Sequence, residues 1–471
     1  MSRAQRIAKS EVRMVQEKNN ANLTQQLAEF VAEKSHGDLP TEVVEQTKLF
    51  ILDTIGCALG GRVQAKEEVT WVTDFAQGQK AEGRSTVFGE VKKTNAVTAA
   101  LTNGTMAHTI DFDDTHMPSI SHLGSSLVAT TFALAEELQS SGAEILEAFV
   151  LGFEVAGRIG RCTMPTHYKY WHPTATFGGI GAAAAAAKLM KLDAVGIEMA
   201  IGYAADAAGG LRYGVNNGDF SKSLHPGMAA MKAVIFAQLI KIGAMGPLGI
   251  LEYPSGFFNA FSENPRPEYL LDRLGETFEV SVGGLKSIPT MQCTHTAVAK
   301  TMDLASQHKL SIEQIEEVSI VQSETIPGQG MNYAPTSPLA ARLSTPFVVS
   351  LGLKDGSVAL DRFTDEMLSD PEINQMMPKI KIKASGDLAE KYPNTVAAIV
   401  NIKTRDGKNF CGEQIYARGD PNNRMSKDEI TTKFQMLARD VIGDDRVNQA
   451  SAEILALEDA ADIYKITNLL S

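Results

Sequence analysis

The sequence is short of cysteine, of clustered basic residues and of long apolar runs. Its four cysteines, Cys57, Cys162, Cys293 and Cys411, are far apart and form no CxxC pair, so we expect neither a zinc knuckle nor a disulfide framework, and a reducing compartment fits. No uncharged apolar run reaches the roughly 18 residues of a membrane span. The net charge is -12 and no segment concentrates Lys and Arg, which disfavours nucleic acid and membranes as partners.

Sequence signals of targeting and of nucleotide chemistry are also missing. Residues 1–20 carry charges throughout and have no apolar h-region, so we expect no secretory signal and a cytoplasmic protein, and we assign this arm no role. Neither a GxSxG motif nor a Walker A lysine loop occurs. The string from Gly179 to Ala184 resembles a dinucleotide fingerprint, but no strand pattern precedes it, and we interpret it as helix packing.

Helical patterns dominate the first 285 residues. We expect a helix from Pro40 to a stop at Gly60-Gly61, and a series of helices between residues 95 and 245. Alanine and glycine recur in that series where leucine is usual, as in the four-residue steps from Gly152 to Gly160. Small residues at this spacing let helices approach closely, so the pattern predicts one tightly packed all-α domain.

After residue 285 the pattern changes. Residues 315–322, 379–383 and 396–403 alternate apolar and polar side chains as strands do, and Asp406-Gly407 fits a hairpin turn. Helical patterns lie between them, and the tail is again helical. We therefore predict a mostly α fold with two domains. They are an all-α domain of residues 20–285 completed by the tail 417–471, and a smaller α+β domain of residues 286–416.

The densest group of titratable residues lies between residues 103 and 126. The sequence before it is helical and offers Thr94 as an N-cap, and a second helical pattern starts at His122. The segment 111–121 between them is polar and contains Pro118, so we expect a loop anchored at both ends by packed helices. Acids and imidazoles on such a loop suit proton transfer. The group consists of His108, Asp111, Asp113, Asp114, His116 and His122.

Two histidines, His122 and His172, stand where a loop enters a helix with small residues following. The free N–H groups of a helix N-terminus bind carboxylates and lower the pKa of a nearby imidazole, so either histidine can accept a proton near pH 7. At a third such position Lys222 can pair with a substrate carboxylate, and His225 shares its helix face. The two histidines that we interpret as structural are His108 and His167.

The acidic run also allows a metal. The segment starting at Asp111 resembles a calcium loop, but His116 and His122 stand where that loop needs glycine and glutamate. Calcium is therefore not expected. A transition metal held by Asp and His side chains of this loop stays an alternative, and it would make the protein a metal-dependent hydrolase.

Several long stretches, taken together, are far more specific than any single motif. They are LDTIGCALGG (52–61), NGTMAHTIDFDDTH (103–116), VLGFEVAGRIGR (150–161), HPTATFGGIGAAAAAAKL (172–189), GDFSKSLHPGMAA (218–230), KSIPTMQCTH (286–295) and ARLSTPFVVSLGLKDG (341–356). These stretches resemble the MmgE/PrpD family over most of the chain. The resemblance implies that the smaller domain is a lid and that the protein is a homodimer working without a required metal or organic cofactor.

The resemblance also implies site residues. Carried over position by position, the family's active site falls on Asp111, Thr115, His122, His172, Lys222 and, at the lid, His295. We expect catalytic roles for His122, His172, Lys222 and Asp111, and substrate-binding roles for Thr115, His225 and His295. Many relatives have Cys or His soon after the proline of the KSIP stretch, whereas this chain has Thr290-Met291-Gln292, a difference that bears on the substrate.

These residues lead to a functional hypothesis. We expect a lyase (dehydratase) that removes water from a small di- or tricarboxylic acid, such as 2-methylcitrate, by abstracting a proton beside a carboxylate. One of His122 and His172 would be the base and the other the acid, in an order that the sequence does not reveal. Epimerisation and decarboxylation of a similar polycarboxylate use the same apparatus and stay open. A helical binding protein without catalysis is a further, less favoured alternative.

Overall fold

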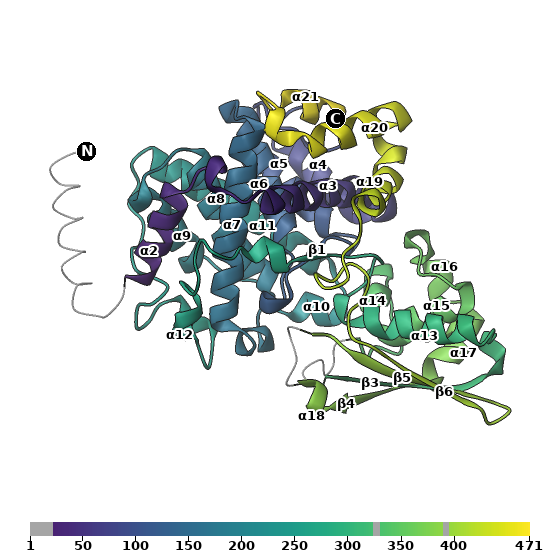
Figure 1. Ribbon diagram of the computed structural model, residues 1–471. Helices are drawn as coiled ribbons and strands as arrows, with labels where there is room; N and C mark the ends of the chain where they lie inside the picture. Colours follow the sequence, from purple (N-terminus) through teal and green to yellow (C-terminus); the bar gives the residue numbers. More distant parts are fainter. Residues whose placement is uncertain (1–21, 324–329, 390–394) are drawn as a thin grey trace.

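The computed structural model describes residues 22–323, 330–389 and 395–471. The N-terminal arm, residues 1–20, lies outside the described residues. Helices dominate and two small sheets complete the structure, so the predicted mostly α fold with an α+β part is confirmed (Figure 1). Within the described ranges, no helix is both long and apolar enough to cross a membrane.

The larger part of the molecule is a bundle of helices around one hydrophobic core, drawn in purple to teal in Figure 1. Helices α5, α6, α7, α8 and α11 pack against one another at its centre. The helices are α2 (Leu23–Glu33), α3 (Thr41–Gln64), α4 (Lys66–Gly78), α5 (Ala96–His108), α6 (Leu123–Leu138), α7 (Gly142–Thr163), α8 (Pro173–Leu189), α9 (Ala194–Asp206), α10 (Tyr213–Asn217), α11 (Phe220–Lys241) and α12 (Phe257–Phe261).

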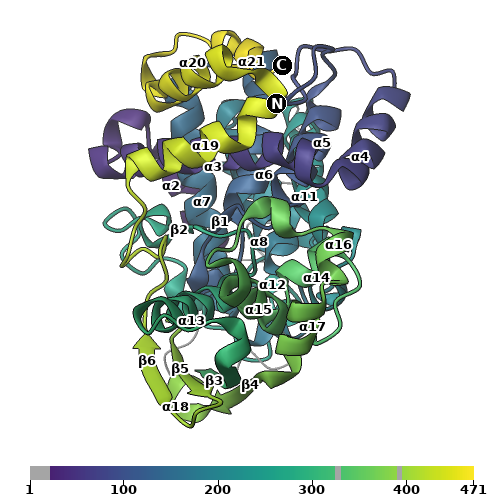
Figure 2. The ribbon, with the colours of Figure 1, turned by 90° about the vertical axis from the view of Figure 1, so that its right-hand side faces the viewer.

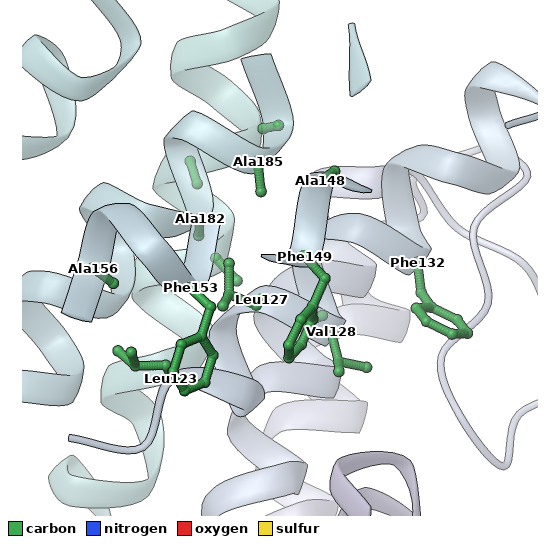
Figure 3. Packing of buried hydrophobic residues seen from close by; sticks show 14 of the residues in the cluster. Leu123, Leu127, Val128, Phe132, Ala148, Phe149, Phe153, Ala156, Ala182 and Ala185 are labelled. Carbon is green, nitrogen blue, oxygen red and sulfur yellow. The ribbon is translucent and has the colours of Figure 1, made fainter. Parts of the chain in front are cut away.

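Small residues let these helices approach closely, as the alanine and glycine spacing predicts. In Figure 3, Phe149 and Phe153 of α7 extend toward Leu127 and its neighbours on α6. A Cβ atom on Gly152 of α7 would lie 2.7 Å from the carbonyl oxygen of Gly181 on α8. A larger side chain at this crossing would therefore push the two helices apart.

The prediction that Gly60-Gly61 ends a helix is wrong, because α3 continues to Gln64. The two glycines instead allow neighbouring helices to pack closely against α3. A Cβ atom on Gly60 would lie 2.6 Å from Leu437 of the tail, and one on Gly61 would lie 2.7 Å from the carbonyl oxygen of Met106 at the end of α5. Glycine is thus required here for close packing and not for a turn.

Polar side chains cap several helix starts. Capping boxes form at Ser141 and at Ser426. The N-cap of α5 is Asn95 and not Thr94, because the Asn95 side chain accepts the N–H of Thr98. Helix α11 starts at Phe220, so Pro226 lies inside it.

The smaller part contains a four-stranded sheet in the order β4-β3-β5-β6. Strands β3 and β4 are parallel, the other pairs are antiparallel, and the predicted turn at Asp406-Gly407 joins β5 to β6. Helices α13 and α15 lie between the sheet and the helical bundle (Figure 2) and share a second hydrophobic core with it. The elements are β3 (Ile315–Ser323), β4 (Ile380–Ser385), β5 (Ala398–Thr404), β6 (Asn409–Gln414), α13 (His295–Gln307), α14 (Pro338–Arg342), α15 (Thr345–Asp355), α16 (Asp365–Leu368), α17 (Pro371–Met376) and α18 (Gly386–Ala389).

The tail helices lie on the larger bundle, away from the sheet (Figure 1, yellow). They are α19 (Lys427–Ile442), α20 (Asp444–Leu455) and α21 (Tyr464–Leu469). Helix α19 packs along α3, and apolar side chains of all three helices belong to the core of the larger bundle. We accordingly propose the domain division at residues 285 and 417 that the sequence suggests.

Two glycine substitutions test the role of close helix packing. A Cβ atom on Gly227 of α11 would clash with the carbonyl oxygen of Leu101 and with Thr105 on α5, whereas one on Gly78 at the end of α4 would meet nothing within 4 Å. We expect Gly227→Ala to lower the free energy of unfolding by about 1–3 kcal/mol. Gly78→Ala should leave it unchanged or raise it by up to about 1 kcal/mol. Urea unfolding of both variants measures this, and equal stabilities would contradict the packing argument.

Candidate active site

The loop between α5 and α6 is held by buried cations. Three successive backbone carbonyls of this loop each accept a hydrogen bond from a different charged side chain, and these side chains come from three distant segments of the chain. The pairs are Arg342 Nη1 with the oxygen of Ile110 (2.9 Å), Lys286 Nζ with the oxygen of Asp111 (2.9 Å) and Lys433 Nζ with the oxygen of Phe112 (2.7 Å). The loop conformation therefore depends on both parts of the molecule and on the tail.

Asp111 is the anion at the centre of the site. Its φ of 51° is in the left-handed region, which an aspartate tolerates better than most residues. One carboxylate oxygen, Oδ1, contacts Lys222 Nζ at 3.1 Å and Lys286 Nζ at 2.7 Å. Burial acts to raise the pKa of Asp111, but the two ammonium groups hold it well below its usual value. The other oxygen, Oδ2, has no hydrogen-bond partner among the described residues.

A chain of hydrogen bonds extends from Lys222 to Asp113. The ammonium group of Lys222 lies 2.8 Å from Nε2 of His108, and Nδ1 of His108 lies 2.7 Å from Asp113. Since the carboxylate accepts from Nδ1, the neutral imidazole accepts the Lys222 proton at Nε2. Burial lowers the pKa of His108 and outweighs the nearby Asp113. The structural interpretation of His108 is thus incomplete, because its ring links two charged groups of the site.

His122 precedes α6 as its N-cap residue, and its tautomer follows from its contacts. Nδ1 lies 2.6 Å from the carbonyl oxygen of Asp114, and a carbonyl only accepts, so Nδ1 carries the proton. Nε2 of the neutral ring is then a bare proton acceptor. Burial first, and the charge of Lys286 second, lower the pKa of His122 from 6.5 to about 3.

The N-terminus of α6 binds a carboxyl group, but that group belongs to a side chain of the protein. The N–H groups of Leu123 and Gly124 donate to the carboxyl oxygens of Asp114 at 3.1 Å and 2.8 Å. Burial and the neighbouring Asp113 raise the pKa of Asp114 well above its usual value. These two amides are therefore engaged and are not available to a substrate carboxylate, contrary to the sequence expectation. Asp114 instead fixes the start of α6 and the backbone that precedes His122.

His172 is the N-cap residue of α8 and is only 3% exposed. Its Nδ1 lies 2.8 Å from Nδ1 of His225 on α11, which leaves Nε2 as its free ring nitrogen. Burial, followed by the neighbouring His225 and His108, lowers the pKa of His172 well below its ordinary value. Near pH 7 this imidazole is therefore neutral.

These side chains line one pocket. The pocket wall includes the five side chains Asp111, Thr115, His122, His172 and Lys222, which the sequence had placed in the active site. Residues from three distant stretches thus converge on one cavity.

The two other predicted substrate ligands, His225 and His295, do not line this pocket. On α11, the ring of His225 meets His172 and stands behind it. His295 begins α13, where Nε2 lies 3.2 Å from the carbonyl oxygen of Thr290, and burial lowers its pKa to about 3. Their positions therefore do not support direct contact with a substrate.

An apolar cluster forms another part of the pocket wall. Its members are Met117, Met291, Cys293, Leu343 and Val396, all of which line the cavity except Val396. Gln292 stands among them, and its Oε1 has no hydrogen-bond partner among the described residues. The segment that departs from the family pattern thus supplies a neutral, largely apolar surface.

Sequence reasoning missed Lys286, although it lies in a stretch that carried the resemblance. Strands β1 (Asp114–Thr115) and β2 (Gly284–Leu285) pair in antiparallel register, which places Lys286 beside Asp111. Two-residue strands have no recognisable sequence pattern. A buried lysine directly after an apolar Gly-Gly-Leu segment was the one available signal.

A metal fits this site poorly. Ligand atoms of His108, Asp111, Asp113 and His122 lie within 4.8 Å of one another, so their number would suffice for a cation. However, Lys222 Nζ already contacts both His108 and Asp111, and a second ammonium group contacts Asp111. A divalent ion there would face two positive charges at short range. The donor set matches ammonium groups better than a metal.

Comparisons with known proteins show what the chain is similar to. Residues 25–270 match the model of the MmgE/PrpD N-terminal domain, and residues 288–459 match that of the C-terminal domain. The chain is 28% identical to cis-aconitate decarboxylase of Mus musculus over 472 residues, which cover 95% of this chain and 93% of that protein. It is 26% identical to the human cis-aconitate decarboxylase (95% and 94% covered) and 26% identical to a cis-aconitate decarboxylase-like protein of Aspergillus oryzae (96% and 97%).

The buried histidines predict how stability depends on pH. Burial lowers the pKa of His122, His167 and His295 from 6.5 to about 3. Below pH 6.5 the unfolded chain therefore binds protons that the folded chain does not, so stability is lost as the pH falls toward 3. Each histidine should lower the free energy of unfolding by about 1.4 kcal/mol per pH unit below pH 6. Urea unfolding at pH 7, 6 and 5 measures the slope, and constant stability over this range would contradict it.

Proposed function

The chain belongs to the MmgE/PrpD family, and from this membership we propose that it is a cofactor-independent lyase acting on a small polycarboxylic acid. The observation that carries the proposal is the convergence of two neutral imidazoles, a buried ammonium group and an anionic carboxylate on one pocket. A neutral imidazole accepts a proton, and an ammonium group stabilises negative charge that builds on a substrate carboxylate. Dehydration beside a carboxylate requires both a proton acceptor and a cation that stabilises the developing charge.

Lys222 and Asp111 bind the substrate in this proposal. The Lys222 ammonium group pairs with the carboxylate next to the reacting carbon and opposes the charge that develops there. The free Oδ2 atom of Asp111 can accept the hydrogen of a substrate hydroxyl. The hydroxyl of Thr115 offers a further hydrogen bond from the same wall.

The hydrogen bonds of the two histidines support one order of their roles. His122 is the base, because its Nδ1 donates to a carbonyl and its Nε2 is bare. His172 is the acid that protonates the leaving hydroxyl, since its Nδ1 faces another imidazole that can donate to it. The proton from carbon thus goes to one ring, and the leaving oxygen takes a proton from the other.

The apolar cluster bears on which acid is used. A substrate with an alkyl group can place it against Met291 and Leu343, two apolar side chains of the pocket wall. This favours dehydration of an alkyl-bearing hydroxy acid of the 2-methylcitrate type. Decarboxylation is the second candidate, because the relatives named above are decarboxylases of cis-aconitate or resemble one. A homodimer remains part of the proposal and rests on sequence resemblance, whereas a cytoplasmic location rests on the missing secretory signal described above.

Substitution of each histidine tests the assignment. We expect His122→Gln and His172→Gln to lower kcat by about 100- to 10,000-fold, because each removes a proton-transfer group. The surface variant His308→Asn should keep the wild-type rate, since His308 stacks on Phe410 in the smaller part of the molecule. Circular dichroism confirms folding. Near-wild-type turnover in both Gln variants would refute the roles.

A panel of acids identifies the reaction. The purified protein is incubated with 2-methylcitrate, citrate and cis-aconitate while alkene absorbance, exchange of substrate protons with deuterated water, and release of carbon dioxide are followed. Dehydration predicts alkene formation without gas, decarboxylation predicts gas, and epimerisation predicts exchange alone. Chelators should leave the rate unchanged, and loss of activity with chelators would favour the metal-dependent hydrolase.

A variant of the apolar cluster tests the substrate preference. Met291→Gln keeps the side-chain length and introduces an amide next to Leu343 and Cys293. We expect the ratio of kcat/KM for the methyl-bearing acid over the unsubstituted acid to fall by about 5- to 20-fold, as loss of contact with one methyl group would predict. Steady-state kinetics with the two acids measure the ratio. An unchanged ratio would show that the alkyl group lies elsewhere.

A further inference from the structure

The contact between His172 and His225 joins two identical ring nitrogens. Both atoms are Nδ1, and they lie 2.8 Å apart. Two bare nitrogens would repel each other and two protonated ones would clash, so a hydrogen bond between neutral rings requires one proton on one of them. The two rings therefore hold opposite tautomers. If His225 carries its proton on Nδ1, His172 carries its own on Nε2, the nitrogen left for the pocket.

This pairing matters because His172 is neutral. Burial and the neighbouring rings lower its pKa well below 6.5, so no imidazolium is present near pH 7 to act as the acid. A neutral imidazole that gives up its only proton becomes an imidazolate, which is very unstable in a buried site without a metal. His172 can protonate a leaving group only if its other nitrogen receives a proton in the same event.

We propose that His225 supplies this proton and connects His172 to solvent, so that the two rings act as a proton relay. The inference rests on the proposed function and assigns His225 a role behind the pocket instead of substrate binding. His225 is half-buried, in contrast to His172, which is 3% exposed. Among the described residues, only His172 forms a hydrogen bond with the His225 ring. Nε2 of His225 is therefore available to water.

The relay balances protons and electrons. The C–O electron pair leaves with the oxygen, which takes the Nε2 proton of His172 and departs as water. The Nδ1 proton of His225 moves to Nδ1 of His172, and a solvent proton adds to Nε2 of His225. Both rings end neutral with exchanged tautomers, and the reverse transfers through the open pocket restore them. The proton that His122 took from carbon returns to solvent after product release, so no net proton is gained.

The surroundings keep His225 neutral between turnovers. Burial first, and then the nearby His108, Lys222 and Lys232, lower its pKa to about 4, while Asp219 acts in the opposite direction. His172, from α8, is the remaining titratable group against the ring. A neutral ring can both accept and donate, as a relay requires.

The His225→Asn variant separates a relay from mere positioning. Its amide can still hydrogen-bond to His172 Nδ1 but cannot pass a proton on. We expect kcat to fall by about 10- to 100-fold with little change in KM, and to recover as imidazole buffer is added. The matched control His308→Asn should show neither effect. A wild-type rate in His225→Asn, or a loss that imidazole does not restore, would overturn the relay.

A substrate-free measurement tests the pair independently of the proposed function. Nitrogen NMR of the histidine rings in the wild-type protein, assigned with the His172→Gln and His225→Asn variants, reports which nitrogen carries each proton. A proton on Nδ1 of His225 together with one on Nε2 of His172 supports the relay, and any other combination in the resting protein overturns it. If opposite tautomers are found but no acid in the panel is converted, the proposed lyase function fails while the hydrogen bond stands.

Discussion

The site depends on pairing charges that are buried together. Asp111, Lys222 and Lys286 are each no more than 2% exposed, and removing Asp111 would leave two buried ammonium groups without their shared counter-ion. Such a loss typically costs about 3–5 kcal/mol, far more than a surface ion pair contributes. Lys286 also binds the backbone of the loop. The charged side chains that neutralise one another therefore also fix the conformation of the loop. The same buried ion pairs therefore determine both the charge balance of the site and the conformation of the loop.

The same charged groups also set the protonation states of Asp111 and His122. The ammonium groups keep Asp111 ionised, and together with burial they keep the imidazole of His122 uncharged, which makes it a base at neutral pH. The backbone then selects the tautomer of that ring through the carbonyl of Asp114. His172 differs because its partner is a second imidazole, which can donate or accept. One hydrogen bond each therefore distinguishes two histidines with similar surroundings, and the proposed roles of base and acid rest on this difference.

Local and family-wide features of the fold and site were predictable from the sequence, whereas long-range pairings were not. The helices, the strands and the convergence of His122, His172 and Lys222 follow from periodicity, helix starts and family resemblance. Lys286 was missed and His108 was interpreted as structural, because their partners are set by strand pairing and side-chain direction. Gly60 was misread as a helix stop because glycine serves both turns and close packing. The position of His225 behind the pocket depends on the angle at which α11 meets α8, which spacing along one helix does not encode.

Lys433 adds a consequence for biosynthesis. This side chain comes from α19, near the end of the chain, yet it binds the carbonyls of Phe112 and Lys286 and pairs with Asp53. During translation the nascent chain lacks this clamp until most of the polypeptide has left the ribosome. The loop that carries the acids and bases therefore gains this contact only after the segment of α19 has been synthesised, and shorter nascent chains lack the hydrogen bond from Lys433 to Phe112.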